Sequence, residues 1–183
     1  MSYKKLLLVL LLVVPATGYA QDEGGGESVL FMGVVTDFPD EFVGVAVDGE
    51  AVTLYICDGN AEEGTVTIAQ WFVGDVVDDA IDITAPNGRR IEVAVEADRA
   101  SGKVTFPDGT VREFTAMLST GKAALFRSEF QIGDDSYVGG WLIQEDGSVR
   151  GAIFKSGSGE LVAASFSGGN QVFQIDPIDL PAR

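Results

Sequence analysis

Short runs of Val, Ile, Thr and aromatic residues extend from Val29 to about Phe173, and Gly, Pro, Asn and Asp interrupt them at regular intervals. Runs of this kind are typical of β-strands, and the residues between them are those that tight turns need. We find no amphipathic pattern long enough to predict a substantial helix. The sequence therefore predicts an all-β fold, an antiparallel meander of roughly ten strands joined by hairpins.

A meander must protect its edge strands, and it can do so by closing on itself or by stacking two sheets. Because the expected strands follow one another through short turns, we expect an up-and-down barrel. A two-sheet β-sandwich is the alternative.

Two hairpins are especially clear. Around Asp48-Gly49, alternation predicts one core-facing stripe and places Tyr55 and Cys57 on the opposite face. The expected stripe consists of Val43, Val45, Val47, Val52, Leu54 and Ile56.

The second hairpin covers residues 137–154, with Asp146-Gly147 as the expected two-residue turn. That turn would pair Ile143 with Arg150 and Trp141 with Ala152, placing Arg150 on the face of Trp141. Both faces are largely apolar, so we expect the hairpin to be interior.

The N-terminus has the pattern of a secretory signal peptide. Lys4-Lys5 precede an apolar run, and small residues precede Gln21, so we expect a signal peptide over residues 1–20. An acidic, Gly-rich leader (21–28), a single all-β domain (29–175) and a loose C-terminal tail (176–183) are expected to follow. We expect an exported protein, periplasmic or extracellular, without membrane insertion after cleavage.

The composition excludes several chemistries. The chain has no His and one Cys, Cys57, which removes Ser-His-Asp, Cys-His and common zinc sites. Cys57 is expected to be a buried apolar residue. A carboxylate-based, glycosidase-like hydrolase remains an alternative. The sequence singles out no two of its 28 acidic residues as the catalytic pair that such an enzyme needs. We therefore assign no catalytic residue and favour a non-enzymatic protein.

Negative charge dominates the first half of the mature chain. Residues 21–88 contain fifteen acidic residues and no Lys or Arg, and the whole chain has a net charge of −16. This argues against nucleic acid as a partner. A solvated acidic surface explains the charge, and a basic protein partner or divalent cations are the alternatives. Asp75, Asp78 and Asp79 form a cluster suited to Ca²⁺ or to an ordinary polar loop, and no other cofactor is expected.

Five residues are candidates for a ligand site. Trp71, Trp141 and Tyr55 could line an apolar pocket, with Arg127 and Arg150 as polar anchors. The alternative for the aromatic residues is core packing, and for the arginines a structural ion pair or stacking contact.

Several short segments carry a resemblance to a known group. They are Tyr55-Ile56-Cys57-Asp58-Gly59, Trp71-Phe72-Val73-Gly74, Leu125-Phe126-Arg127, Gly140-Trp141-Leu142-Ile143, Asp146-Gly147 and Arg150-Gly151. In this order they resemble a group of exported bacterial β-rich proteins or domains, over about residues 29–155. The resemblance implies no activity. The leading hypothesis is a secreted or periplasmic binding or structural domain, whose ligand and oligomeric state the sequence leaves open.

Overall fold

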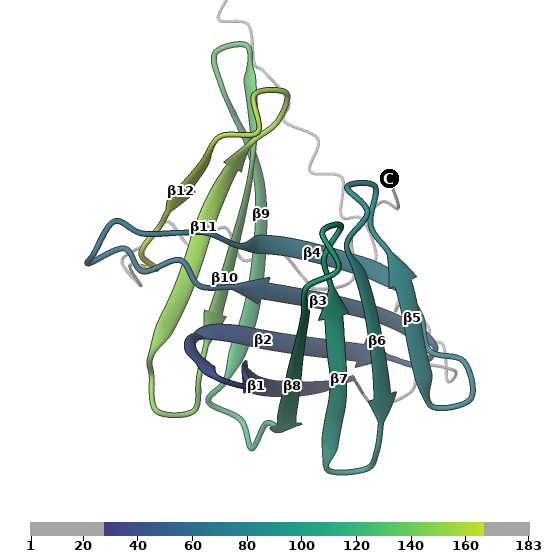
Figure 1. The fold of residues 1–183 in the computed structure, drawn as a ribbon. Helices are drawn as coiled ribbons and strands as arrows, with labels where there is room; N and C mark the ends of the chain where they lie inside the picture. The colour runs from purple at the N-terminus through teal and green to yellow at the C-terminus, as the bar shows by residue number, and fades with distance from the viewer. Residues whose placement is uncertain (1–27, 167–183) are drawn as a thin grey trace, which may run out of the picture.

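The computed structural model describes residues 28–166, and all of its regular secondary structure is β (Figure 1). The expected signal peptide, most of the acidic leader, the end of the expected domain and the C-terminal tail lie outside these residues. Within the described range, no helix is long and apolar enough to cross a membrane.

Eight strands form one antiparallel sheet in the order β4-β3-β2-β1-β8-β7-β6-β5. They are β1 (Val29–Val35), β2 (Phe38–Asp48), β3 (Ala51–Cys57), β4 (Ala69–Asp75), β5 (Ala80–Thr84), β6 (Arg90–Val95), β7 (Arg99–Thr105) and β8 (Val111–Leu118). Because β1 also pairs with β8, the sheet curls into a nearly closed up-and-down barrel whose seam lies between β4 and β5. The expected barrel is confirmed.

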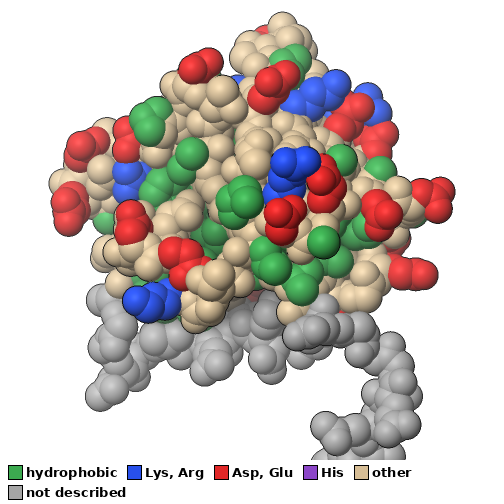
Figure 2. Space-filling model, turned by 90° about the horizontal axis from the view of Figure 1, so that it is seen from below, with side chains coloured by type: hydrophobic (Ala, Val, Ile, Leu, Met, Phe, Trp, Pro, Cys, Tyr) green, Lys and Arg blue, Asp and Glu red, His purple; other side chains and the backbone are tan. Residues whose placement is uncertain are grey.

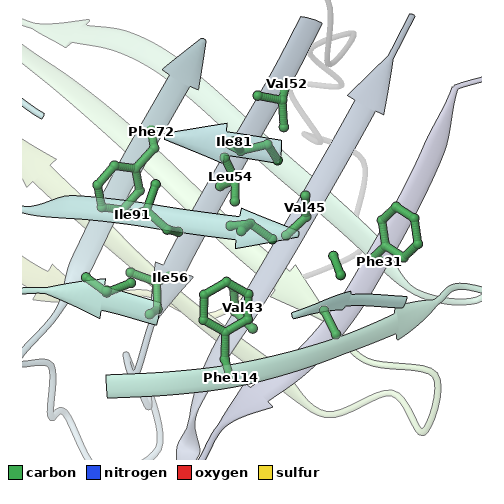
Figure 3. Packing of buried hydrophobic residues seen from close by; sticks show 14 of the residues in the cluster. Phe31, Val43, Val45, Val52, Leu54, Ile56, Phe72, Ile81, Ile91 and Phe114 are labelled. Carbon is green, nitrogen blue, oxygen red and sulfur yellow. The ribbon is translucent and has the colours of Figure 1, made fainter. Parts of the chain in front are cut away.

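The barrel is flattened, and its core lies between two halves. In Figure 1, β1–β4 run across the view while β5–β8 stand nearly upright, so the halves cross at a large angle. The expected stripe faces this core: Val43, Val45, Leu54 and Ile56 are fully buried (Figure 3). Aromatic and branched side chains from the other strands fill the remaining space, as expected for a small eight-stranded barrel. They include Phe31, Phe72, Ile81, Ile91 and Phe114.

A second antiparallel sheet packs against the outer face of β1–β4. Its strands are β9 (Ala124–Ile132), β10 (Asp135–Ile143), β11 (Val149–Lys155) and β12 (Leu161–Ala163), in the order β12-β11-β10-β9. Met32, Phe42, Tyr55 and Cys57 from the barrel wall meet Leu142 and Ala152 from this sheet. Strands β2 and β3 are therefore buried on both faces, which is why both of their faces are largely apolar. The described residues contain twelve strands rather than about ten.

The register predicted for the β10–β11 hairpin is wrong by one residue. Ile143 pairs with Val149, and Trp141 with Gly151. The loop has three residues, Glu145 to Gly147, because the Gln144 N–H donates to the Ser148 carbonyl (2.9 Å) and Gly147 takes a positive φ of 87°. The Asp146 side chain stabilises this turn by accepting from the Ser148 N–H (2.8 Å).

A one-residue slip exchanges the faces of a strand. Arg150 therefore lies opposite Leu142, on the face directed at the barrel, and not beside Trp141. In the same register Phe154 pairs with Val138.

Candidate functional site

Three of the five predicted ligand residues line one groove between the edge of the barrel and the second sheet. The groove has a volume of about 570 Å³. Tyr55 comes from β3, Trp71 from β4 and Arg127 from β9. The complete lining is Tyr55, Thr67, Ala69, Gln70, Trp71, Pro86, Asn87, Arg89, Arg127, Val138, Ala152, Phe154, Gly159 and Leu161.

A stacked aromatic pair forms the inner wall of the groove. Tyr55 and Trp71 are direct partners across β3 and β4, and their ring centroids are 4.1 Å apart with an interplanar angle of 23°. Tyr55 is buried, whereas Trp71 is partly exposed. Gly140 of β10 leaves the room for this pair, because a Cβ there would lie 2.5 Å from the Tyr55 ring and 2.8 Å from the Trp71 ring.

Arg127 brings a positive charge to the aromatic pair. It lies opposite Gly140 across β9 and β10, and its Cζ is 5.7 Å from the centroid of the Trp71 ring. The guanidinium also forms an ion pair with Glu129, whose side chain is half exposed. An ion pair with an exposed carboxylate contributes little free energy, so Arg127 can exchange this partner at low cost.

A hydrogen-bonded cluster at the β5–β6 turn forms the opposite rim. The Gln70 Oε1 accepts from the Asn87 Nδ2 (2.6 Å) and from the Arg89 Nη1 (3.1 Å), and the Gln70 Nε2 donates to the Trp71 carbonyl (2.7 Å). The Arg89 guanidinium also lies 5.4 Å from the centre of the Phe106 ring. These contacts hold Arg89 at the rim of the groove, next to Gln70.

Sequence reasoning missed Gln70, Asn87 and Arg89 as site residues. Two signals could have identified two of them: Gln70 directly precedes Trp71, and Arg89 is the first basic residue after a long acidic stretch.

Buried polar groups beneath the groove are held in their neutral forms. Burial raises the pKa of the Tyr55 hydroxyl well above its ordinary 10.0. Burial likewise raises the pKa of the Cys57 thiol to about 11, although the hydrogen bonds from Tyr55 and the Gly59 N–H lower it. Cys57 is fully buried, as the sequence predicted. Both groups are therefore uncharged at neutral pH.

Trp141 lies on the other face of β10, away from the groove. Its ring covers Gly139 and Gly151, where an added Cβ would approach it to 2.4 Å and 2.2 Å. Its indole N–H donates to the Ala164 carbonyl (3.1 Å), and Phe166 packs edge-on against it. These contacts make Trp141 a packing residue of the second sheet.

Arg150 also lies outside the groove lining. Its Nε donates to the Asp40 carbonyl (3.0 Å), its Nη2 pairs with the Asp40 carboxylate (2.5 Å), and its guanidinium stacks 4.8 Å from the centre of the Phe42 ring. Arg150 thus fastens β11 to the start of β2.

Asp75, Asp78 and Asp79 lie at the end of β4 and in the turn before β5. No three His, Cys, Asp or Glu side chains within residues 28–166 are placed to hold a metal ion. Asp78 and Asp79 instead take positive φ values of 51° and 59° in the turn before β5, a conformation that Asp tolerates better than most residues. Across the face in Figure 2, acidic side chains are spread among basic and apolar ones, as a solvated surface would have them.

A buried ion pair at one end of the barrel was not predicted. Glu41 is 2% exposed and pairs with Arg112, whose guanidinium lies between the rings of Phe38 (4.3 Å) and Phe106 (4.9 Å). Burial raises the pKa of Glu41 above its ordinary 4.5, although the Arg112 charge lowers it. The Glu41 Oε1 and the Arg112 Nε have no hydrogen-bond partner among the described residues.

Comparisons with known proteins assign no family. No family model matches the chain, and no curated protein matches it. A solved crystal structure from Nitrosomonas europaea, whose protein carries only the provisional name AttH, aligns with 83% of this chain and 74% of its own at 11% identity. Its TM-score of 0.23 is too low to support any conclusion about fold or function. The resemblance to exported bacterial β-proteins therefore stays a prediction.

Proposed function

We propose that this protein is an exported, non-enzymatic binding protein that holds a small molecule in the groove between the barrel and the second sheet. The observation that carries the proposal is the Trp71 ring, which is stacked on buried Tyr55, partly exposed, and flanked by Arg127. Ligand sites commonly combine apolar and aromatic walls with a few well-placed polar groups.

The size of the groove supports a small ligand. Its volume of about 570 Å³ lies within the usual range for such sites, roughly 300–1,000 Å³. Two different sheets supply the walls, so the groove is bounded on two sides by backbone that the core holds in place.

The chemistry of the lining supports binding rather than catalysis. The described lining residues include no Asp, Glu, His or Cys. An arginine remains protonated and cannot act as a general base, and the pKa of Tyr55 is raised by burial. General acid–base catalysis needs a group whose pKa lies near the working pH.

Export is part of the same proposal, and it depends on the N-terminal sequence alone. The basic residues, the apolar run and the small residues before Gln21 are the features that support it. If the full chain is expressed in a bacterium and the accumulated protein is analysed by mass spectrometry, the expected N-terminus is Gln21. An intact Met1 on the accumulated protein would contradict export.

Binding can be followed through the tryptophans, because the chain has only two. Trp71 lies in the groove and Trp141 on the far face of β10, so each serves as the control for the other. The two indole N–H signals in a ¹⁵N–¹H correlation spectrum are assigned with the variants Trp71→Phe and Trp141→Phe.

The protein is then titrated with 2-naphthamide, a flat neutral probe, and with 2-naphthoate, its anionic counterpart. Binding in the groove is expected to move the Trp71 signal and to leave that of Trp141 nearly unchanged. If neither probe moves the Trp71 signal at millimolar concentration, the proposed binding function is wrong.

A further inference from the structure

We infer that the ligand of this groove is a planar, ring-containing organic acid, with its ring against Trp71 and its carboxylate between Arg127 and Arg89. This inference rests on the proposed function and specifies the chemical class of the ligand.

The charge of the groove is opposite to that of the molecule. The whole chain has 28 acidic and 12 basic residues, yet the groove lining contains two arginines and, among the described residues, no carboxylate. Among the described lining residues, the charged side chains are both arginines. The groove therefore offers a local site for an anion on a protein whose net charge is negative.

The hydrogen-bonding capacity left in the groove consists mainly of donors. Both lone pairs of the Gln70 carbonyl are used, by Asn87 and by Arg89. The Asn87 Oδ1 already accepts from the Arg89 backbone N–H (3.2 Å), and the Thr67 hydroxyl is directed to Asp58. Each guanidinium has five N–H donors and no acceptor, so a ligand that matches this rim must supply acceptor atoms.

The geometry of the arginines favours a carboxylate over a single acceptor atom. A guanidinium is planar and can form two parallel hydrogen bonds with a carboxylate. Arg127 is paired with the half-exposed Glu129, so a carboxylate in the groove can replace Glu129 without leaving a buried acid unpaired. Arg89 is fixed by Gln70 through one nitrogen, which leaves its other donors available.

The apolar part of the lining favours a flat ring. Tyr55 supports the Trp71 ring from behind at 4.1 Å, so the indole is a rigid platform for offset stacking. Val138, Ala152, Phe154 and Leu161 form the apolar surface across the groove from this platform.

The inference is tested with the same two probes by isothermal titration calorimetry. The two probes share a ring system and differ in charge, so their ratio of affinities isolates the carboxylate. We expect 2-naphthoate to bind about tenfold more tightly or better than 2-naphthamide, because one charge-assisted interaction provides roughly that factor. Arg127→Gln is expected to remove most of this preference while 2-naphthamide still binds, and Arg89→Gln to reduce it.

Arg150→Gln is the matched control. Arg150 is also an arginine of the second sheet that stacks on an aromatic ring and pairs with an acid, but it lies outside the groove. This variant is expected to keep the tenfold preference. The melting temperature of each variant is measured alongside, so that a loss of folding is recognised.

Each outcome separates the inference from the proposed function. Equal affinity of the two probes, or a preference that survives in both Arg127→Gln and Arg89→Gln, would overturn the organic-acid inference and leave the binding function intact. If neither probe binds, both the organic-acid inference and the proposed binding function are wrong.

Discussion

At the scale of single residues, burial keeps the Tyr55 hydroxyl and the Cys57 thiol neutral. Cys57 and Tyr55 lie in the apolar layer between the barrel wall and the second sheet, and Glu41 lies at the barrel end, paired with Arg112. Burial disfavours the charged forms of Tyr55 and Cys57, so their raised pKa values depend on the contact between the two layers.

Cys57 is expected to be inert in the native protein. With its pKa raised to about 11, only about one molecule in a thousand carries the thiolate at pH 8. Iodoacetamide labelling at pH 8, followed by mass spectrometry, is expected to be slow in buffer and fast in denaturing urea. Native labelling at the rate of a free thiol would show that Cys57 is accessible.

Glu41 is expected to give an unusual pH dependence. Because burial raises its pKa above 4.5 in the folded state, the folded protein binds this proton more tightly than the unfolded chain does. The contribution of Glu41 to the free energy of unfolding is therefore greatest at low pH, and it falls as pH rises through the raised pKa. The decrease is about 1.4 kcal/mol for each pKa unit.

The measurement compares the wild type with Glu41→Gln in urea titrations between pH 4 and pH 8. The difference in free energy of unfolding, wild type minus variant, is expected to fall as pH rises. The comparison cancels the titration of the other acids. A difference that grows with pH would mean that attraction to Arg112 outweighs the cost of burial.

At the scale of elements, the β10–β11 hairpin uses glycines to make room for aromatic rings on both of its faces. Gly139 and Gly151 accept Trp141 on the outer face, while Gly140 accepts Tyr55 and Trp71 on the barrel face. Glycines at these positions let aromatic rings lie flat on the backbone. The sequence showed the paired glycines and the aromatic residues, but not which ring covers which glycine.

Gly140→Ala is expected to separate the second sheet from the barrel locally. Its new methyl group would sit 2.5 Å from the Tyr55 ring, and overpacking of this kind costs about 1–3 kcal/mol. We expect a lower free energy of unfolding in urea, together with a shift of the Trp71 indole N–H signal.

Gly49→Ala is the control for the loss of a glycine. Gly49 has a positive φ of 60° and no heavy atom within 4 Å of an added Cβ, so the cost there is backbone strain alone, about 1–2 kcal/mol. Its Trp71 signal should not move. An unchanged Trp71 signal in Gly140→Ala would contradict the close packing of Gly140 on the aromatic pair.

At the scale of the whole molecule, local sequence patterns predicted the strands better than their arrangement. Alternation in β2 and β3 identified the Val43–Ile56 stripe, and it also placed Tyr55 on the opposite face. It could not show that a second sheet covers that face, because stacking depends on contacts between distant segments. The length of the loop around Asp146-Gly147 was predicted wrongly, because Asp-Gly suits loops of two and of three residues. The extra loop residue shifts the register of β11 by one and so places Arg150 on the other face.

The candidate site was only partly predictable, because local patterns reveal residue types but not contacts between distant segments. Tyr55, Trp71 and Arg127 were identified by residue type. Arg89 joins them only because the barrel curls until the β5–β6 turn meets β4, which no local pattern encodes.

The two sheets are expected to unfold in one transition. The outer face of β1–β4 forms half of the second apolar cluster, so neither layer can open without exposing the other. Urea titrations followed by far-UV circular dichroism and by the fluorescence of each single-tryptophan variant should have coincident midpoints. Loss of the Trp141 signal before the far-UV signal would indicate that the second sheet unfolds separately.

Because the groove draws one wall from each sheet, its occupant would act as a clamp across their junction. Any molecule that binds only when both walls are in place raises the melting temperature in proportion to the logarithm of its concentration. If the proposed binding function is correct, the resistance of the protein to heat would then report the concentration of ligand around it.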